Sequence, residues 1–329
     1  MEDVNTAMGL VAAESLGVTL MHEHLYANLL KEYRATGLLN NEQTMITEVD
    51  AFVAVSGGTI VDVTPAELTR GASPDPGQAI AQSMQGEEHW PSRSPANVQA
   101  VRSIAEATGA NVVLGTGHYR DPYLGDWLDE HSVERIAEHL VEDVETGISG
   151  SGVRAGIIGE IGADKWFVSA REERSFRAAA RAQRRTGLAL TTHAARWPVG
   201  IAQLDLLAEE DVDPSRVIIG HCDSVPLFEY HESIAKRGAF VQYDLIRGES
   251  SAQTQQTVQL VIEMVRRGYI KHLLLSHDVC TSSQLASNGG AGFAFVPTVF
   301  ADALEEAGLE RAEIQSILVD NPRRALAGQ

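Results

Sequence analysis

Eight short apolar runs, most of them rich in β-branched residues, are spaced along this 329-residue chain and limit the folds it can adopt. The segments between them have helical periodicity. One begins at Ser94-Pro95, a capping residue followed by proline at the first helical position, and ends at Gly109. Strand followed by helix, eight times over, predicts an α/β protein: a (β/α)8 or TIM barrel with a closed parallel sheet. The predicted strands lie at 18–24, 58–63, 110–117, 155–160, 188–193, 216–221, 239–244 and 272–278.

We interpret residues 1–329 as a single domain, because one barrel of this kind commonly reaches this length. Residues 1–17 precede the first strand as an N-terminal extension. Two loops exceed the usual connection length, 64–93 after the second strand and 280–295 after the eighth. Both leave the face where the carboxyl ends of the strands meet. They are therefore candidate lids or pocket walls, the alternative being ordinary surface excursions.

The chain is acidic, with 26 basic and 45 acidic residues and a formal net charge of −19. Such a balance repels a polyphosphate backbone, so we expect a small-molecule substrate and no nucleic acid partner. No run of about 18 apolar residues occurs, and the start lacks a basic leader, so we expect a cytoplasmic protein with no membrane association. The two cysteines, Cys222 and Cys280, cannot supply a disulfide framework and are expected to fill space near the site.

Ionisable residues stand at or next to the ends of five of these runs. His22 and His24 share the first run, and side chains two residues apart on a strand point to the same side. The carboxyl ends of all strands in such a barrel share one face, where the active sites of this fold lie. Imidazoles and carboxylates gathered at that face predict a metal site. The six candidate ligands are His22, His24, Glu160, His193, His221 and Asp278.

Six ligands exceed the need of one zinc ion and suffice for two. Glu160, central in the order and with two carboxylate oxygens, is the candidate bridging ligand. Two ions would turn a water between them into a bridging hydroxide that attacks a carbonyl or phosphoryl centre, with Asp278 as the catalytic proton acceptor. The ligands suit zinc first, then manganese, cobalt or iron. The predicted division is three ligands at the more buried ion, His22, His24 and Asp278, and two at the other, His193 and His221.

The remaining histidines are not expected to bind the ions. His277 has the opposite strand parity from Asp278, so we predict a hydrogen-bonded structural residue that points out of the barrel. His272 starts its strand and belongs at the far rim. No GxSxG motif occurs, so covalent catalysis is not supported. Four histidines fall in loops or helices and are predicted to face solvent: His89, His131, His139 and His231.

The same residues carry a resemblance to a known family. LGVTLMHEHL, GIIGEIG, VIIGHCD, SHDVCT and the closing VDNPRRAL resemble, in this order, the phosphotriesterase family of the amidohydrolase superfamily over essentially the whole chain. The loop 64–93 looks longer than usual. Glu160 stands where other members have a carboxylated lysine, as in the branch of phosphotriesterase-related and resiniferatoxin-binding proteins. The resemblance implies metal-dependent hydrolysis with the same six ligands and Asp278 as proton acceptor, and similar barrels commonly form homodimers.

Residues that follow the strand ends are candidates for the substrate pocket. They are Tyr119, Trp166 and Arg247, with His118, Arg196 and Trp197 as further ones. Arginines at the mouth favour a substrate with a carboxylate, phosphate or sulfonate group. Because the resembled family includes several activities, we expect first a lactone or carboxylic ester bearing an anionic group, with N-acyl amide hydrolase and organophosphate triesterase as alternatives. A TatD-type metal nuclease and a non-catalytic small-ligand-binding protein on the same fold are the remaining alternatives.

Overall fold

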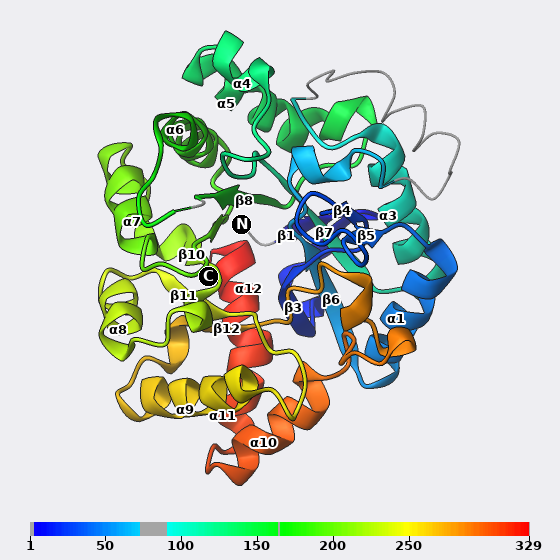
Figure 1. The fold of residues 1–329 in the computed structure, drawn as a ribbon, viewed down its shortest axis with the longest axis vertical. Coiled ribbons are helices and arrows are strands. Elements are labelled where there is room, and N and C mark those ends of the chain that lie inside the picture. Colours follow the sequence, from blue (N-terminus) through cyan, green and yellow to red (C-terminus); the bar gives the residue numbers. More distant parts are fainter. Residues whose placement is uncertain (1–2, 73–90, 164, 329) are drawn as a thin grey trace.

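The computed structural model describes residues 3–72, 91–163 and 165–328, and an eight-stranded parallel sheet lies at its centre (Figure 1). Neighbouring strands pair in chain order, as expected when each strand is followed by a right-handed crossover. All eight predicted strands are present. Their bounds are Val18–Glu23 (β3), Gly57–Asp62 (β6), Asn111–Thr116 (β7), Ile157–Gly162 (β8), Leu190–His193 (β9), Val217–Ile219 (β10), Phe240–Tyr243 (β11) and Leu273–Leu275 (β12).

The two outer strands of this sheet, β3 and β12, meet and nearly close the barrel. The backbone amide of His22 donates a hydrogen bond to Ser276 Oγ at 2.9 Å. The amide of Asp278 donates to the carbonyl of His22 at 3.1 Å. The first and last strands of the sheet are thus side by side, and the prediction of a (β/α)8 barrel is confirmed.

Helices surround the sheet (Figure 1), and several of them begin and end at the predicted signals. Ser94 caps α3 by accepting from the Asn97 amide, and Gly109 ends this helix with a left-handed φ of 71°. Ser169 and Glu172 form the capping box of α6. The helices are α1 (Glu42–Ala54), α3 (Pro95–Thr108), α4 (Asp126–Glu130), α5 (Val133–Glu142), α6 (Ala170–Thr186), α7 (Gly200–Glu209), α8 (Phe228–Lys236), α9 (Ala252–Arg266), α10 (Ala301–Glu306), α11 (Arg311–Gln315) and α12 (Asn321–Ala327).

The inside of the barrel is filled by buried apolar side chains from its strands. This inner layer includes Met21, Val61, Val113, Ile157, Ile218, Phe240 and Leu274. The N-terminal extension packs against its lower end, because β1 (Asp3–Thr6) and β2 (Gly9–Ala12) form an antiparallel hairpin whose Val4 joins the same cluster. The Ala7 amide also donates to the carbonyl of Val112, near the start of β7, at 2.7 Å. Apolar side chains therefore fill this end of the barrel, and the polar side chains lie at the opposite end.

The two long loops lie beyond the carboxyl ends of their strands. In the loop after β6, residues 73–90 lie outside the described part of the chain, and whether this loop acts as a lid stays a prediction. Its described end is held by Arg93, whose buried guanidinium donates to Asp62 Oδ1 at 3.2 Å. The loop after β12 contains two short 3-10 turns, Ser282–Gln284 and Ala286–Asn288. A short ladder after β3 pairs β4 (Ala27–Asn28) with β5 (Leu38–Leu39).

The structure also bears on two expectations from composition. Across the residues described, no helix combines the length and the apolar character needed to cross a bilayer. Cys222 and Cys280 are both buried and free, as expected for residues that fill space. The expected location in the cytoplasm stays a prediction.

Candidate metal centre

Strand β3 brings two histidines to the polar end of the barrel. The side chains of His22 and His24 are buried. His22 Nε2 lies 3.5 Å from Glu160 Oε1, and His24 Nε2 lies 3.3 Å from Asp278 Oδ1. The His24 ring is held from behind by the Thr64 hydroxyl, 2.9 Å from Nδ1. The first strand and the end of the last strand therefore meet at one cluster of ionisable groups.

Glu160 lies at the centre of this cluster. Its Oε1 is 2.6 Å from His193 Nδ1 and 3.0 Å from His221 Nε2, and these two ring nitrogens are 2.9 Å apart. Gly159, the residue before Glu160, permits the Glu160 carboxylate to approach these two histidines. It has a φ of 118°, and a Cβ at this position would lie 2.2 Å from the carbonyl oxygen of Thr191. Only glycine fits here, so the Gly-Glu pair in this run presents the carboxylate to both histidines.

The prediction that each polar ligand is the last residue of its strand is wrong for several strands. β10 stops at Ile219 and β12 at Leu275, before His221 and Asp278 are reached. Both of these residues have a left-handed backbone, with φ values of 54° and 52°, which a strand cannot continue. Glu160, in contrast, lies inside β8. Left-handed residues other than glycine are uncommon; the described residues include six, and two of them, His221 and Asp278, lie in this cluster.

Three groups of three side chains in the described part of the chain have the composition and spacing to hold a metal ion. In each group the ligand atoms lie within 4.8 Å of one another, and Glu160 belongs to two of the groups. Among the described residues, His22 Nε2 and Glu160 Oε2 are buried without a hydrogen-bond partner. Because an unpaired buried polar atom is costly, these two atoms fit the role of cation ligands. Glu160 forms one group with His22 and His24 and a second with His193 and His221, and the third group is His22, His221 and Asp244.

Burial and neighbouring charges set the protonation of the cluster. Burial pushes the pKa of Glu160 up, but the nearby His193 and His22 outweigh it and hold this pKa well below its usual value. Burial lowers the pKa of His193 to about 4, so this imidazole is neutral at neutral pH and has a free lone pair. Burial also acts to raise the pKa of Asp278, but a hydrogen bond from His24 and neighbouring positive charges lower it overall. Asp278 is therefore ionised at neutral pH and can accept a proton.

One carboxylate that the sequence analysis did not assign holds two of the histidines from behind. Asp244 is fully buried directly after β11, with Oδ1 at 2.7 Å from His221 Nδ1 and Oδ2 at 3.2 Å from His22 Nδ1. Gln242 Nε2 donates to Asp244 Oδ2 at 2.7 Å. Carboxylates that bind the far nitrogen of a metal-ligating histidine fix its ring orientation. The signal was present, because Asp244 ends its apolar run as the predicted ligands do.

Two of the three predicted substrate-binding residues lie beside the cluster. Tyr119 is buried, with its hydroxyl 3.5 Å from His193 Nδ1. Arg247 Nη2 donates to Asp278 Oδ2 at 2.9 Å. Trp166, in contrast, is 69% exposed and packs edge-on against Phe167, so the structure does not bring it to the cluster. The substrate-binding roles of all three stay predictions.

The further pocket candidates differ in their surroundings. His118 is buried, with Nδ1 at 2.7 Å from Glu67 Oε1. Arg196 and Trp197 are exposed in the segment after β9. The amide of Arg196 donates to Ser224 Oγ at 2.7 Å, which ties this segment to the turn that follows His221. These contacts place His118 in a fixed position and leave the side chains of the other two in contact with solvent.

The histidines outside the cluster are mostly structural. His277 is buried and hydrogen-bonded through both ring nitrogens, as predicted. His272 binds the Ala239 carbonyl through Nδ1 at 3.0 Å, near the start of β12. The prediction that His231 faces solvent is wrong. It is fully buried on the inner side of α8, where its ring binds the carbonyl of Cys222 at 2.8 Å and the hydroxyl of Tyr243 at 2.9 Å.

The other three histidines predicted to face solvent have mixed outcomes. His131 and His139 are half-buried, because both rings pack against Trp127. The prediction of full exposure is therefore wrong for these two as well, since a neighbouring aromatic ring covers part of each imidazole. His89 lies outside the described residues.

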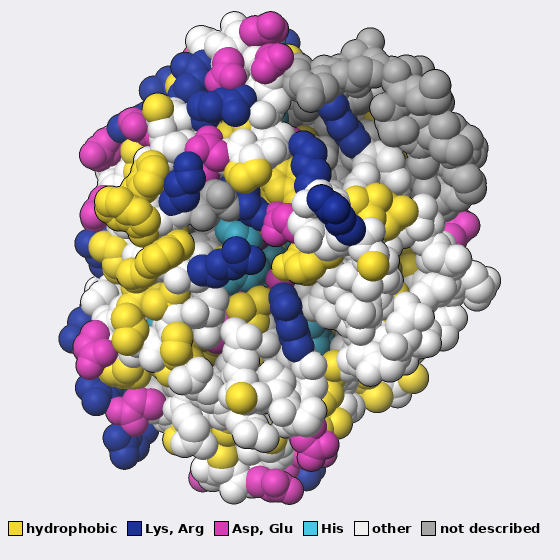
Figure 2. Space-filling model, viewed as in Figure 1, with side chains coloured by type: hydrophobic (Ala, Val, Ile, Leu, Met, Phe, Trp, Pro, Cys, Tyr) yellow, Lys and Arg dark blue, Asp and Glu magenta, His cyan; other side chains and the backbone are white. Residues whose placement is uncertain are grey.

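The molecular face with the cluster gathers basic side chains. Figure 2 shows histidine side chains at the bottom of a hollow near the middle of this face, with Lys and Arg side chains around it. Arg247 is the basic residue in direct contact with the cluster, through Asp278. In a chain with a net charge of −19, basic side chains around this hollow would favour the approach of a small anion.

Comparison with known proteins agrees with this fold. The phosphotriesterase family model matches residues 2–75 and 92–326, leaving out a stretch of the loop that looked longer than usual. The phosphotriesterase homology protein of Escherichia coli is 31% identical, over 93% of this chain and 96% of its own. The N-acetyltaurine hydrolase of Dictyostelium discoideum is 25% identical, over 98% and 97%. A crystal structure of a resiniferatoxin-binding protein from Rhodobacter sphaeroides is 29% identical and has a TM-score of 0.84, over 99% of this chain and 95% of its own.

A parallel barrel with a cluster of histidines and carboxylates at the carboxyl ends of its strands defines a class of metal-dependent hydrolases. Within this class, the chain belongs to the phosphotriesterase family. The resemblance seen in the sequence is confirmed. The TatD-type nuclease is not supported by any of these matches.

Proposed function

We propose that the protein is a binuclear metal-dependent hydrolase that cleaves a small carbonyl substrate bearing an anionic group. The observation that supports this most directly is the position of Glu160, whose carboxylate joins the group of His22 and His24 to the group of His193 and His221 and has a buried, unpaired oxygen. A carboxylate with two oxygens can bind two ions at once. We therefore assign Glu160 as the bridging ligand.

The described side chains divide into two ligand sets around Glu160. His22 and His24, with Asp278 at 3.3 Å from His24, would hold one ion. His193 and His221 would hold the other through Nδ1 and Nε2, the nitrogens that face Glu160. Two divalent ions, zinc in this proposal, would supply an acidified water as nucleophile and polarise the scissile carbonyl oxygen. Zinc suits a set of imidazoles and carboxylates, although manganese, cobalt and iron accept the same ligands.

The chain's own residues supply the proton transfer and the orientation of the substrate. Asp278 is ionised at neutral pH and lies against His24, so it can accept the proton of the nucleophile and pass it to the leaving group. We propose that Tyr119, whose hydroxyl lies 3.5 Å from His193 Nδ1, donates a hydrogen bond to the substrate carbonyl. Arg247 would hold the anionic group, and its contact with Asp278 and its several donors support this role.

The substrate that fits best is an N-acyl amide of an anionic amine. The relatives include N-acetyltaurine hydrolases from several animals and an amoeba, and the hollow in Figure 2 has basic side chains around it. A sulfonate or carboxylate would pair with Arg247 while the amide carbonyl lies at the cluster. The anionic lactone or carboxylic ester expected from the sequence is the second candidate, and the same Arg247 contact favours it.

A hydrolysis screen with the metal-loaded protein tests this proposal. The panel contains N-acyl amino sulfonates and N-acyl amino acids, lactones and esters with and without a carboxylate, and a phosphotriester. We expect turnover of anionic amides, and a preference for anionic over neutral members of each class. Preference for the phosphotriester or for neutral substrates would contradict the proposal. Two bound ions with no hydrolysis of any member would favour the non-catalytic ligand-binding alternative.

Two finer proposals concern the state of the protein in the cell. We propose that it forms a homodimer, as similar barrels do, and that it resides in the cytoplasm. Light scattering of the purified chain tests the first of these, and a monomer mass would contradict it. Fractionation of the native host tests the second.

A further inference from the structure

Glu23, the last residue of β3, lies between His22 and His24 and has a buried carboxylate whose two oxygens are both hydrogen-bonded. Its Oε1 accepts hydrogen bonds from the Ser276 hydroxyl at 2.7 Å and from the His277 backbone amide at 2.8 Å, and lies 2.8 Å from His277 Nδ1. Its Oε2 accepts from the Val279 amide at 2.9 Å. All of these partners lie in the segment from Ser276 to Val279, so the Glu23 carboxylate faces that segment and not the cluster that His22 and His24 enter.

These hydrogen bonds enclose Asp278 on both sides. The amides of His277 and Val279 bind the Glu23 carboxylate, while the amide of Asp278 itself donates to the His22 carbonyl at 3.1 Å. Asp278 has a left-handed φ of 52°, a conformation that is unfavourable for a residue other than glycine. Three successive amides bound to β3 therefore hold Asp278 in a backbone conformation that it would not adopt alone.

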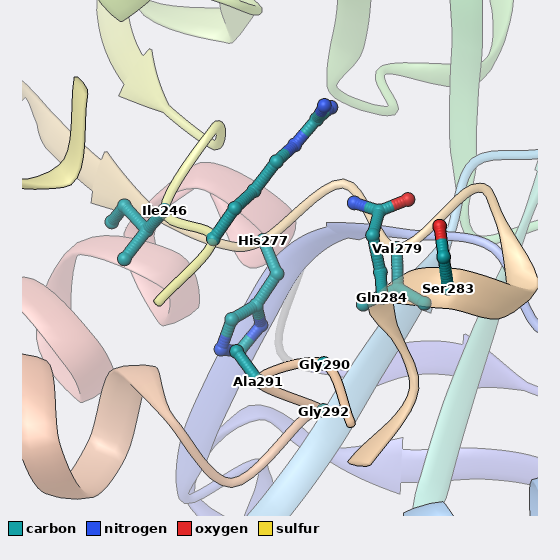
Figure 3. Close-up of a pocket in the computed structure, with 9 residues that line it drawn as sticks. Ile246, His277, Val279, Ser283, Gln284, Gly290, Ala291 and Gly292 are labelled. Carbon is teal, nitrogen blue, oxygen red and sulfur yellow. The ribbon is translucent and has the colours of Figure 1, made fainter. Parts of the chain in front are cut away.

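The same contact reaches the loop after β12. With Nδ1 of His277 bound to Glu23, its Nε2 accepts a hydrogen bond from the Val296 amide at 2.9 Å, where the loop 280–295 ends. His277 also lines a small cavity of about 70 Å³ between this loop and the segment after β11. Figure 3 shows its imidazole ring against the turn formed by Gly290, Ala291 and Gly292. Glu23 thus holds the start of this loop directly and its end through His277.

We propose that Glu23 is a positioning residue: it sets the Asp278 carboxylate in register with His22 and His24, and it anchors the loop after β12. It neither binds an ion nor carries a proton. This inference rests on the proposed function only in that Asp278 serves as a ligand and proton acceptor. Its consequence is that the affinity for the ion next to Asp278 depends on a carboxylate that faces away from that ion.

A second buried glutamate provides a matched control. Glu48 on α1 is 2% exposed, and its two oxygens accept from the amides of Ala286 and Ser287 at 2.9 Å and 2.8 Å. Glu48 therefore binds the same loop by the same kind of contact, eight residues beyond Asp278. A role limited to stability would make the two glutamates equivalent. A positioning role would distinguish them.

The experiment compares Glu23→Gln with Glu48→Gln in the full-length protein. Glutamine keeps the size of the side chain, but one carboxylate oxygen becomes an NH₂ group that would face a backbone N–H donor. Each variant therefore loses a hydrogen bond from a backbone amide to the side chain. The measurements are the affinity for each zinc ion by chelator competition, the melting temperature, and kcat and KM on one substrate. For Glu23→Gln we expect about 10- to 100-fold weaker binding of one ion, as for outer contacts of metal ligands. We also expect a loss of about 100-fold in kcat.

For Glu48→Gln we expect a comparable fall in melting temperature with both zinc affinities within about twofold of the wild type. Ser276→Ala removes one hydroxyl donor from Glu23 and also the acceptor of the His22 amide, so it should weaken binding of the same ion, and it serves if Glu23→Gln does not fold. Wild-type zinc affinities in Glu23→Gln or, if that variant does not fold, in Ser276→Ala would overturn the inference. Equal weakening by Glu48→Gln would do the same. If the wild-type protein itself bound no metal, the proposed function would fail instead.

Discussion

The contact between Arg247 and Asp278 leads to a prediction about substrate selectivity. Arg247 Nη2 lies 2.9 Å from Asp278 Oδ2, and the side chain is about one third exposed at the mouth of the barrel, with a relative exposure of 36%. An incoming sulfonate or carboxylate would meet this guanidinium close to the cluster. A hydrogen bond to a charged group contributes about 1.5–3 kcal/mol. Replacing Arg247 with methionine should therefore lower kcat/KM for an anionic substrate by about 10- to 150-fold.

The assay has to separate this effect from the loss of the Asp278 partner. We would measure kcat/KM for an N-acyl amino sulfonate and for the neutral sulfonamide of the same shape, in the wild type and in Arg247→Met. Any change in Asp278 affects both substrates and cancels in the ratio of the two kcat/KM values. We expect this ratio to fall by about 10-fold or more.

The matched control is Arg266→Met. Arg266 lies on α9 with a 73% exposed side chain that pairs with Glu263 at 2.7 Å, so its loss removes the same charge away from the cluster. The ratio should stay within about twofold of the wild type in this variant, because exposed ion pairs contribute little. An unchanged ratio in Arg247→Met, or an equal fall in Arg266→Met, would refute the assignment of Arg247 as the anion-binding residue.

Three further predictions follow from the cluster. Asp278→Asn should keep the fold, shown by circular dichroism, and lower turnover by about 100-fold or more; near wild-type turnover would contradict its role as proton acceptor. Burial acts to lower the pKa of His221, but Asp244 outweighs it and raises this pKa well above its usual value. His221 therefore holds a proton at neutral pH, and a zinc ion must displace this proton to bind. Zinc affinity should rise with pH up to this pKa, and calorimetry in two buffers should detect proton release. A zinc affinity that does not depend on pH would contradict this. Gly159→Ala should lower the free energy of unfolding by about 2 kcal/mol or more in urea titrations, because its Cβ would lie 2.2 Å from the Thr191 oxygen.

The fold and most of the cluster could be predicted from the sequence because both depend on a short-range pattern. The alternation of apolar runs and helical segments is visible locally, and the closed barrel then brings the run ends to one face. His22 and Asp278 are 256 positions apart in the chain, yet the strand-end rule alone placed them together, and the structure has the Asp278 amide on the His22 carbonyl.

What the sequence did not reveal depends on backbone geometry and on partners outside the run ends. Nothing in VIIGH or LLLSHD signals that His221 and Asp278 leave the strand in a left-handed conformation. Asp244 ends its run as the predicted ligands do, but its role behind the rings of His221 and His22 is visible only in the contacts of the folded chain. Trp166 was placed in the pocket by its position after a strand, but the direction of a loop side chain is not encoded in periodicity.

The metal content of the wild-type protein and of Glu160→Gln tests the central claim most directly. Glu160 is the one residue common to the two ligand groups that it forms with His22 and His24 and with His193 and His221. We predict two ions per chain in the wild type by mass spectrometry of the zinc-loaded protein, and one or fewer in Glu160→Gln with turnover lost. Two tightly held ions in Glu160→Gln, or none in the wild type, would contradict the account.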